Sequence, residues 1–136
     1  MKKIVSILLC SVLCATLLAQ ENKTPEEREK ELYESIQKQV DQLTDQLSLE
    51  DWQVFYVDSI LTHDWNAMLQ DFNSMSAAKV SNSDLFSDVQ DKWAEQIYNA
   101  LHKVFNEDQW ARYLKSGAAR DKKLRDKRAA KKAGKS

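Results

Sequence analysis

The two histidines, His63 and His102, are the side chains best suited to chemistry at neutral pH, because imidazole can transfer protons and bind metal ions. Asp64 and Met68 follow His63 closely and would share its helix. A metal site needs three or four converging ligands, and a nucleophilic site needs a base beside an activated hydroxyl or thiol. Neither pattern surrounds the histidines. We therefore predict polar surface positions for both, with no metal and no cofactor.

The carboxylates and cysteines give no better case for catalysis. Glu50 and Asp51 fit the first turn of a helix, where the helix dipole favours negative charge. Cys10 and Cys14 both lie in the N-terminal segment 1–19, so a chain that has lost this segment has no thiol nucleophile, redox centre or disulfide. The serines lie mainly at expected caps and turns. We predict that the protein is not an enzyme.

The N-terminal segment 1–19 has the pattern of a secretory signal peptide. Lys2 and Lys3 supply the positive charge, Ile4 to Leu18 the apolar stretch, and Ala19 a small residue for cleavage. The stretch is short for a membrane span, which needs about 20 apolar residues, although an uncleaved anchor is an alternative. Neither cysteine follows the small residue that a lipoprotein signal requires. The expected location is the periplasm, reached through a cleavable signal peptide.

The rest of the chain predicts an all-α fold. It holds one proline, Pro25, and two glycines, Gly117 and Gly134, and it lacks the turn signals and alternating β-branched runs of strands. Its length suffices for one modest core. We expect a helical domain over residues 20–117 and a basic tail, helical in part or disordered, over residues 118–136.

The first expected helix has a clear beginning. Thr24 suits the N-cap, Pro25 the first helical position and Glu27 the third, which together predict a capping box. Apolar residues then recur every three or four positions and predict one narrow buried stripe: Leu32, Ile36, Val40, Leu43 and Leu47.

The second expected helix is long, running from Leu49 to about Ala78, or about 45 Å. The segment from Val54 to Val57 is apolar on more than one side, so we expect two packing partners, one of them from a second subunit of a homodimer. The main apolar stripe of this helix comprises Val54, Val57, Leu61, Trp65, Met68, Phe72 and Met75.

A turn at residues 81–83 predicts the start of a third helix, and Asn106 with Gln109 predicts the capping box of a fourth. The third helix has apolar positions at Leu85, Val89, Trp93, Ile97, Leu101 and Val104. The expected architecture is an elongated helical hairpin or four-helix arrangement that dimerises and carries a basic C-terminal extension.

Charge divides the chain into two parts. Residues 20–111 hold 7 basic and 19 acidic residues, whereas residues 112–136 hold eleven basic residues and two acids. The tail could be a solvated extension, could contact an anionic lipid surface, or could attract acidic clients or its own acidic body. We expect a solvated helix that frays, and no nucleic-acid partner, because the signal peptide directs the chain out of the cytosol. The basic residues of the tail expected to supply electrostatic attraction are Lys122, Lys123, Arg125, Lys127 and Arg128.

Two of the expected helix starts are similar to each other, one over residues 47–53 and one over residues 104–109. Each places a large apolar residue before an acidic turn that ends in glutamine. The residues of this motif are Leu49, Gln53, Phe105, Asn106 and Gln109. The pattern resembles the Leu-Thr-x-x-Gln motif that occurs twice in the Spy/CpxP family of periplasmic stress proteins, and the leader, helix spacing and basic end extend the similarity over most of the chain.

The two copies match that family pattern to different degrees. In the second, Phe105 stands for Leu and Asn106 for Thr, and Asn has the same capping chemistry as Thr. In the first, Glu50 takes the Thr position, so we expect capping of the second helix to pass to Ser48.

The resemblance implies a thin, curved dimer that acts as an ATP-independent chaperone and holds unfolding clients on its concave face. Other family members restrain an envelope-stress sensor kinase, and a further branch binds metal. Methionine and aromatic side chains on the long helices could supply client contact, although at helical spacing they are also typical core residues. The candidates for client binding are Phe55, Trp65, Met68, Phe72 and Trp93.

Two other functions fit the same sequence. The chain could be a non-catalytic helical module that recognises one specific envelope protein. It could instead bind an anionic lipid surface through its basic tail. The absence of a Gly-rich phosphate-binding loop argues only against a nucleotide-driven cycle.

Overall fold

A computed structural model describes residues 23–135, so the expected signal peptide lies outside the described residues. Within residues 23–135 the chain is helical and has no strand, which confirms the expected all-α class. The elements in order are α2 (Pro25–Leu47), α3 (Asp51–Ala77), α4 (Ser83–Val104), α5 (Glu107–Tyr113), the π-helical turn η1 (Leu114–Ala118) and α6 (Ala119–Ala133).

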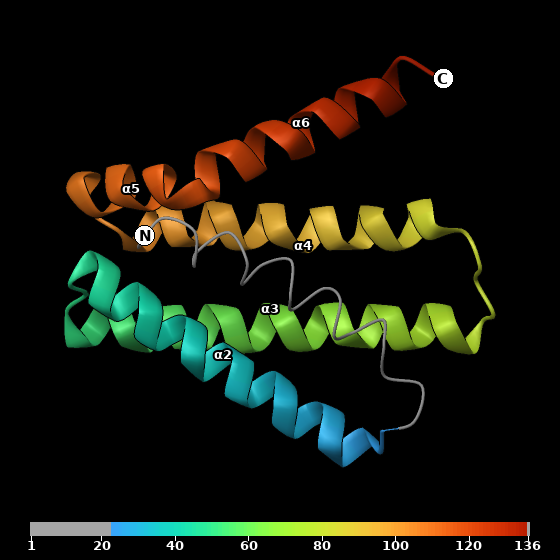
Figure 1. Cartoon of the computed structure of the whole chain (residues 1–136), viewed down its shortest axis with the longest axis horizontal. Helices are drawn as coiled ribbons and strands as arrows, with labels where there is room; N and C mark the ends of the chain where they lie inside the picture. Colours follow the sequence, from blue (N-terminus) through green and yellow to red (C-terminus); the bar gives the residue numbers. More distant parts are fainter. Residues whose placement is uncertain (1–22, 136) are drawn as a thin grey trace, which may run out of the picture.

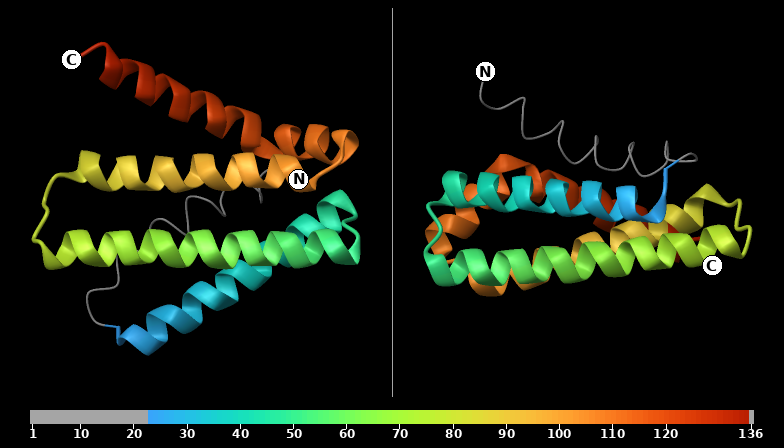
Figure 2. Two further views of the ribbon diagram at one scale, coloured as in Figure 1. Left: turned by 180° about the vertical axis from the view of Figure 1, so that it is seen from behind. Right: turned by 90° about the horizontal axis from the view of Figure 1, so that it is seen from below.

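The helices form an elongated, open arrangement rather than a closed bundle (Figure 1). Helices α3 and α4 run antiparallel as a long hairpin, and α2 crosses α3 obliquely. Helices α5 and α6 fold back beside α4, with α6 diverging towards the C-terminus (Figure 2). Three connections therefore lie towards one end of the molecule: α2–α3, α4–α5 and α5–α6. The α3–α4 turn lies at the other end.

Helix α2 begins as the sequence predicts. The Thr24 hydroxyl accepts from the Glu27 N–H (3.2 Å), and the Thr24 N–H donates to Glu27 Oε2 (3.0 Å), which completes the capping box with Pro25 in the first turn. The five residues of its apolar stripe are all buried.

The predicted cap of the second helix is wrong. Ser48 is instead the C-cap of α2, with a left-handed φ of 52° and its backbone N–H bonded to Thr44 O. The N-cap of α3 is Glu50, whose backbone N–H donates to Gln53 Oε1 (3.0 Å). Ser48 cannot cap α3 because closing α2 already fixes its backbone conformation.

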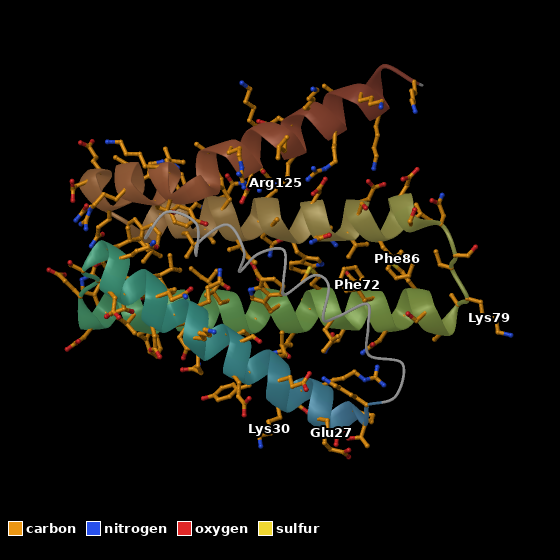
Figure 3. The ribbon with its side chains drawn as sticks, in the orientation of Figure 1. Glu27, Lys30, Phe72, Lys79, Phe86 and Arg125 are labelled. Atoms are coloured by element: carbon orange, nitrogen blue, oxygen red, sulfur yellow. The ribbon has the colours of Figure 1, made fainter. Side chains whose placement is uncertain are left out.

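The core is concentrated near the end of the molecule that holds the three connections. Its buried residues come mainly from α2 and the first half of α3, with Leu101 and Phe105 from the end of α4. Towards the α3–α4 turn the packing thins, and Phe72 stacks on Phe86 with ring centroids 5.8 Å apart (Figure 3). Leu85 near the start of α4 remains 46% exposed. The core comprises Leu32, Ile36, Val40, Leu43, Leu47, Val57, Leu61, Leu101 and Phe105.

Candidate functional site

The two motif glutamines meet in the interior, although they are 56 residues apart in sequence. Gln53 Nε2 donates to Gln109 Oε1 (2.6 Å), and Gln109 Nε2 donates to Gln53 Oε1 (3.0 Å). Gln53 is 3% exposed and Gln109 4%. A buried primary amide is costly unless its donors and acceptor are paired, and here each amide pairs with the other.

Each glutamine also binds main-chain groups at both helix junctions. Gln53 Nε2 donates to Val104 O (3.0 Å) at the end of α4, and Gln109 Nε2 lies 3.4 Å from Leu47 O at the end of α2. The backbone N–H of Asn106 donates to Gln109 Oε1 (3.0 Å), as in the predicted capping box. We call this pair, Gln53 and Gln109, the glutamine clasp. It joins the α2–α3 and α4–α5 junctions.

Arg112 extends the clasp to the surface. Its Nη1 donates to Gln46 O (3.0 Å) and its Nη2 to Leu47 O (3.1 Å), so the guanidinium satisfies free carbonyls at the C-terminus of α2. Asp108 pairs with the same guanidinium (2.9 Å). Phe105 is buried and Leu49 packs against the core, so both motif residues contribute to the packing at this end of the molecule.

The histidines lie apart from each other. His63 Nδ1 lies 2.7 Å from Oδ1 of the buried Asp64, which Gln96 Nε2 also approaches (3.3 Å). His102 stacks on Trp110 with ring centroids 4.1 Å apart. Among residues 23–135 no three His, Cys, Asp or Glu side chains are placed to hold a metal ion.

A groove of about 640 Å³ lies between α6 and the α3–α4 hairpin, with one residue from α2. Its apolar lining includes Trp65 and Met68 from α3, Ile97 and Tyr98 from α4 and Leu124 from α6. Its charged lining comprises Asp91, Arg120, Asp121, Arg125 and Arg128. We call this cavity the α6 groove. Apolar and charged side chains line this open hollow together, and such a surface can hold part of another molecule.

The five predicted client-binding residues do not all meet there. Trp65 and Met68 line the α6 groove, and the Trp65 indole N–H is buried without a hydrogen-bond partner. Trp93 donates its indole N–H to Asp71 Oδ2 (2.7 Å) and, like Phe72, links α4 to α3.

Phe55 lies elsewhere, on the outer face of α3, and is 68% exposed. It contacts Tyr56, which contacts Trp52, with ring centroids 5.7 and 6.1 Å apart. Trp52 and Tyr56 are about half exposed. We call these three residues the outer aromatic patch.

The basic tail is the exposed helix that the sequence predicts, but the expected fraying is wrong, because Ala119–Ala133 form the continuous helix α6. Four of its basic side chains also pair with acids on α4. Lys122 Nζ lies 2.9 Å from Glu95 Oε1, and Arg125 Nη2 lies 3.2 Å from Glu95 Oε2. The side chain of Arg125 is only 11% exposed. Figure 3 shows it on the side of α6 that faces α4. Of the alternatives for the tail, the structure shows attraction to the acidic body of the same chain.

Two further pairs complete this row. Arg128 makes a bidentate contact to Asp91, with Nε to Oδ2 and Nη2 to Oδ1 both at 2.7 Å, and Lys132 pairs with Asp88. We call the four pairs the α4–α6 ladder. The Asp91 carboxylate raises the pKa of Arg128, and the carboxylates of Asp126 and Glu95 raise the pKa of Lys122.

The remaining tail cations have a different environment. Lys123 and Lys127 are exposed, together with Lys131, and a helical step of about 100° per residue places them on the side of α6 away from the ladder. Net charge alone does not distinguish Lys123 and Lys127 from the paired residues of the tail. The matching intervals of acids on α4 and cations on α6 were the available signal.

Searches against protein-family profiles, curated proteins and solved structures found no match for this chain. None of the helices over residues 23–135 is both long and apolar enough to span a bilayer. The functional argument therefore depends on the α6 groove and the surfaces around it.

Proposed function

We propose that the protein is a non-catalytic, ATP-independent chaperone of the periplasm that holds unfolded or partly folded proteins. The observation that supports this most strongly is the α6 groove, where apolar and charged side chains line one hollow. The resemblance of the two glutamine motifs to the Spy/CpxP pattern supports the same function. The two motif glutamines join the helix junctions at the end of the molecule that supports the groove.

The groove has the chemistry of an adaptable binding site. Met68 and Trp65 offer polarizable and aromatic surface that accommodates side chains of varied shape. Charges of both signs at the rim attract polypeptides over a distance, and salt weakens that attraction. A volume of about 640 Å³ accommodates a few side chains of an extended or helical segment, not a folded domain.

Two exposed leucines allow a matched test. Leu124 is 45% exposed and lines the groove, whereas Leu85 is 46% exposed and is not among the groove's lining residues. Leu124→Asp and Leu85→Asp should each leave the fold intact, because neither leucine is buried. The assay is light scattering from a denatured client diluted into residues 20–136 without ATP.

We expect the unsubstituted protein and Leu85→Asp to suppress scattering equally, and Leu124→Asp, which alters one wall of the groove, to change the protein concentration needed for the same effect several-fold. Equal loss in both variants would remove the groove from the proposal. Unchanged scattering with a several-fold excess of the unsubstituted protein would remove the chaperone function itself.

A homodimer belongs to this proposal. The outer aromatic patch places three large exposed rings together on one face of α3, and an exposed apolar patch of this kind is a candidate contact for a second subunit. Sedimentation equilibrium of residues 20–136 should show a dimer, and Phe55→Asp should shift it to monomer. A monomer at concentrations used for the chaperone assay would contradict this part.

Binding to an anionic lipid surface is the second candidate. The observation that favours it is the side of α6 opposite the α4–α6 ladder, where Lys123, Lys127 and Lys131 are exposed in one row. It predicts sedimentation with phosphatidylglycerol vesicles at low salt, lost in the variant with glutamine at all three positions. Equal sedimentation of that variant would exclude this surface.

A further inference from the structure

Helix α6 is attached to the rest of the molecule by charge and not by apolar burial. None of its residues is buried, and its one large apolar side chain, Leu124, is nearly half exposed. Its contacts with α4 come from the α4–α6 ladder, in which cations at four positions of α6 meet three acids of α4, and from Lys122 and Arg125, which also lie over the Tyr98 ring. The pairs at Arg128 and Lys132 are partly exposed, and exposed ion pairs contribute little individually and are screened by salt.

The chain has a kink in the connection that precedes α6. Gly117, in the π-helical turn η1, has a φ of 127°, a value that other residues rarely adopt. A Cβ at this position would meet no atom within 4 Å, so the glycine serves the backbone conformation and not close packing. A π-helical turn with one non-helical residue is a natural pivot between α5 and α6.

The ladder and the groove share residues. Arg125, Arg128 and Asp91 belong to both, and Leu124 lies between the ladder cations in sequence. The position of α6 therefore determines both the width of the groove and whether the acids of α4 are available. Moving α6 away would expose Trp65 and Met68 beside the acidic row Asp88, Asp91 and Glu95.

We propose that α6 is a displaceable lid on the groove, and that basic segments of client proteins displace it by competing for the acidic row on α4. This rests on the proposed chaperone function and specifies its clients: unfolded segments that are rich in Lys or Arg and carry an isolated large apolar residue. Helix α6 is the internal substitute for such a segment. Its own sequence, cationic with a single leucine, shows the chemistry that the open groove accepts.

The lid can be observed directly by electron spin resonance distances. Residues 20–136 contain no cysteine, so Ser81→Cys and Ala130→Cys introduce the only two labelling sites, both on exposed residues. At low salt we expect one narrow distance distribution. Raising the salt to about 1 M, where the screening length falls to about 3 Å, should broaden it and shift it to longer distances.

A peptide probe tests the client class. The probe has the sequence of residues 118–136, and its control has every Lys and Arg replaced by glutamine. We expect the basic peptide to open the lid at low salt and the control peptide to leave it closed. If both peptides open it, or neither does, basic segments are not the displacing ligand.

Matched variants separate the ladder from general charge. Arg125→Gln with Arg128→Gln removes two ladder cations, and Lys123→Gln with Lys127→Gln removes two exposed cations from the same helix. Only the first pair should open the lid at low salt. Asp91→Arg should open it too, and adding Arg128→Asp should close it again by restoring the pair in reverse. An unchanged distance distribution in all of these variants would contradict the proposal that α6 is a displaceable lid.

The chaperone assay then distinguishes the lid from the proposed function. We expect the ladder variant to suppress aggregation of a basic client at two- to five-fold lower protein concentration than the exposed-cation variant. If the lid opens but both variants suppress equally, the lid does not control binding. If the lid opens and no variant suppresses aggregation, the chaperone function fails while the hinge motion stands.

Discussion

The glutamine clasp and the α4–α6 ladder are two regions of the molecule that are stabilised by different kinds of interaction. At the glutamine clasp, buried amides and apolar side chains join two helix junctions without net charge. Along the α4–α6 ladder, partly exposed ion pairs join two helices without a buried apolar residue on α6. The first kind of contact resists salt and dissociates only on unfolding, whereas the second weakens with salt and can open within the folded protein.

This difference indicates a division of labour. The clasp end gives the α3–α4 hairpin a fixed base, so the groove residues Trp65 and Ile97 keep their positions. The α6 side supplies the movable wall. Substitutions at the two ends should therefore differ in size, salt dependence and effect on client binding.

The largest effect is expected in the core beside the clasp. Leu61 is fully buried, and Leu61→Ala should lower the free energy of unfolding by about 2–5 kcal/mol through lost burial and a residual cavity. Urea denaturation followed by circular dichroism measures it. Leu85→Ala is the control, and we expect a change within about 0.5 kcal/mol because Leu85 is exposed. Similar losses at the two leucines would contradict the assigned core.

Breaking the clasp should have the next largest effect. Gln109→Leu removes the partner of Gln53 and leaves buried polar groups unpaired, so we expect a loss of about 1–3 kcal/mol. Gln46→Leu, at an exposed neighbour, is the control. In a double-mutant cycle with Gln53→Leu the losses should not add, since each substitution breaks the same pair. Additive losses would show that the amides act independently.

A substitution at Gly117, in the kink before α6, should have a smaller effect than breaking the clasp. Gly117→Ala places a side chain at a φ of 127°, and we expect a cost of about 1–3 kcal/mol or a reorientation of α6 that relieves it. The distance between spin labels at Ser81→Cys in the α3–α4 turn and Ala130→Cys in α6 distinguishes the two outcomes. Gly134→Ala, at a residue with an ordinary helical φ, should change neither stability nor distance. No effect of Gly117→Ala on either quantity would exclude a strained pivot.

Removing ladder cations should cost least. Arg125→Gln with Arg128→Gln should lower the free energy of unfolding by about 1 kcal/mol or less at low salt and by nothing measurable at about 1 M salt. Thermal denaturation at two salt concentrations measures this dependence. A loss that persists at high salt would mean that packing, and not charge, holds α6.

Alkaline pH should weaken the ladder at Lys122. Its pKa is raised above the ordinary 10.5 by Asp126 and Glu95, so its ion pairs are complete at neutral pH and are lost as the pH rises through the raised value. The α6 distance should therefore broaden only in strongly alkaline solution. Lys122→Arg should delay the broadening, because guanidinium remains protonated there. Broadening between neutral and mildly alkaline pH would contradict the assignment.

Much of the fold followed from local sequence signals. The capping boxes at Thr24 and Asn106 and the five buried residues of α2 were predictable, because each depends on residues within a turn or on one helical period. The cap at Ser48 was wrong because the left-handed end of α2 competes for the same residue. Local preference cannot decide between adjacent helix ends.

The site was less predictable, because it depends on which helices pack together. Trp65 and Met68 were chosen for their chemistry and line the groove, but Phe55 has the same apolar character and lies on the outer face. The clasp joins residues 56 positions apart, which no periodic pattern reveals. The ladder depends on the register of α6 against α4, so counting charges could not separate Arg128 from Lys127.

Hydrogen exchange of residues 20–136, with and without a basic unfolded client and at low and high salt, is the most direct test of the central claim. The account predicts that amides of α6 exchange faster on client binding and at high salt, while amides beside the clasp, in residues 53–61 and 101–109, remain as protected as before. Faster exchange at both ends, or unchanged exchange in α6 when the client is bound, would contradict it.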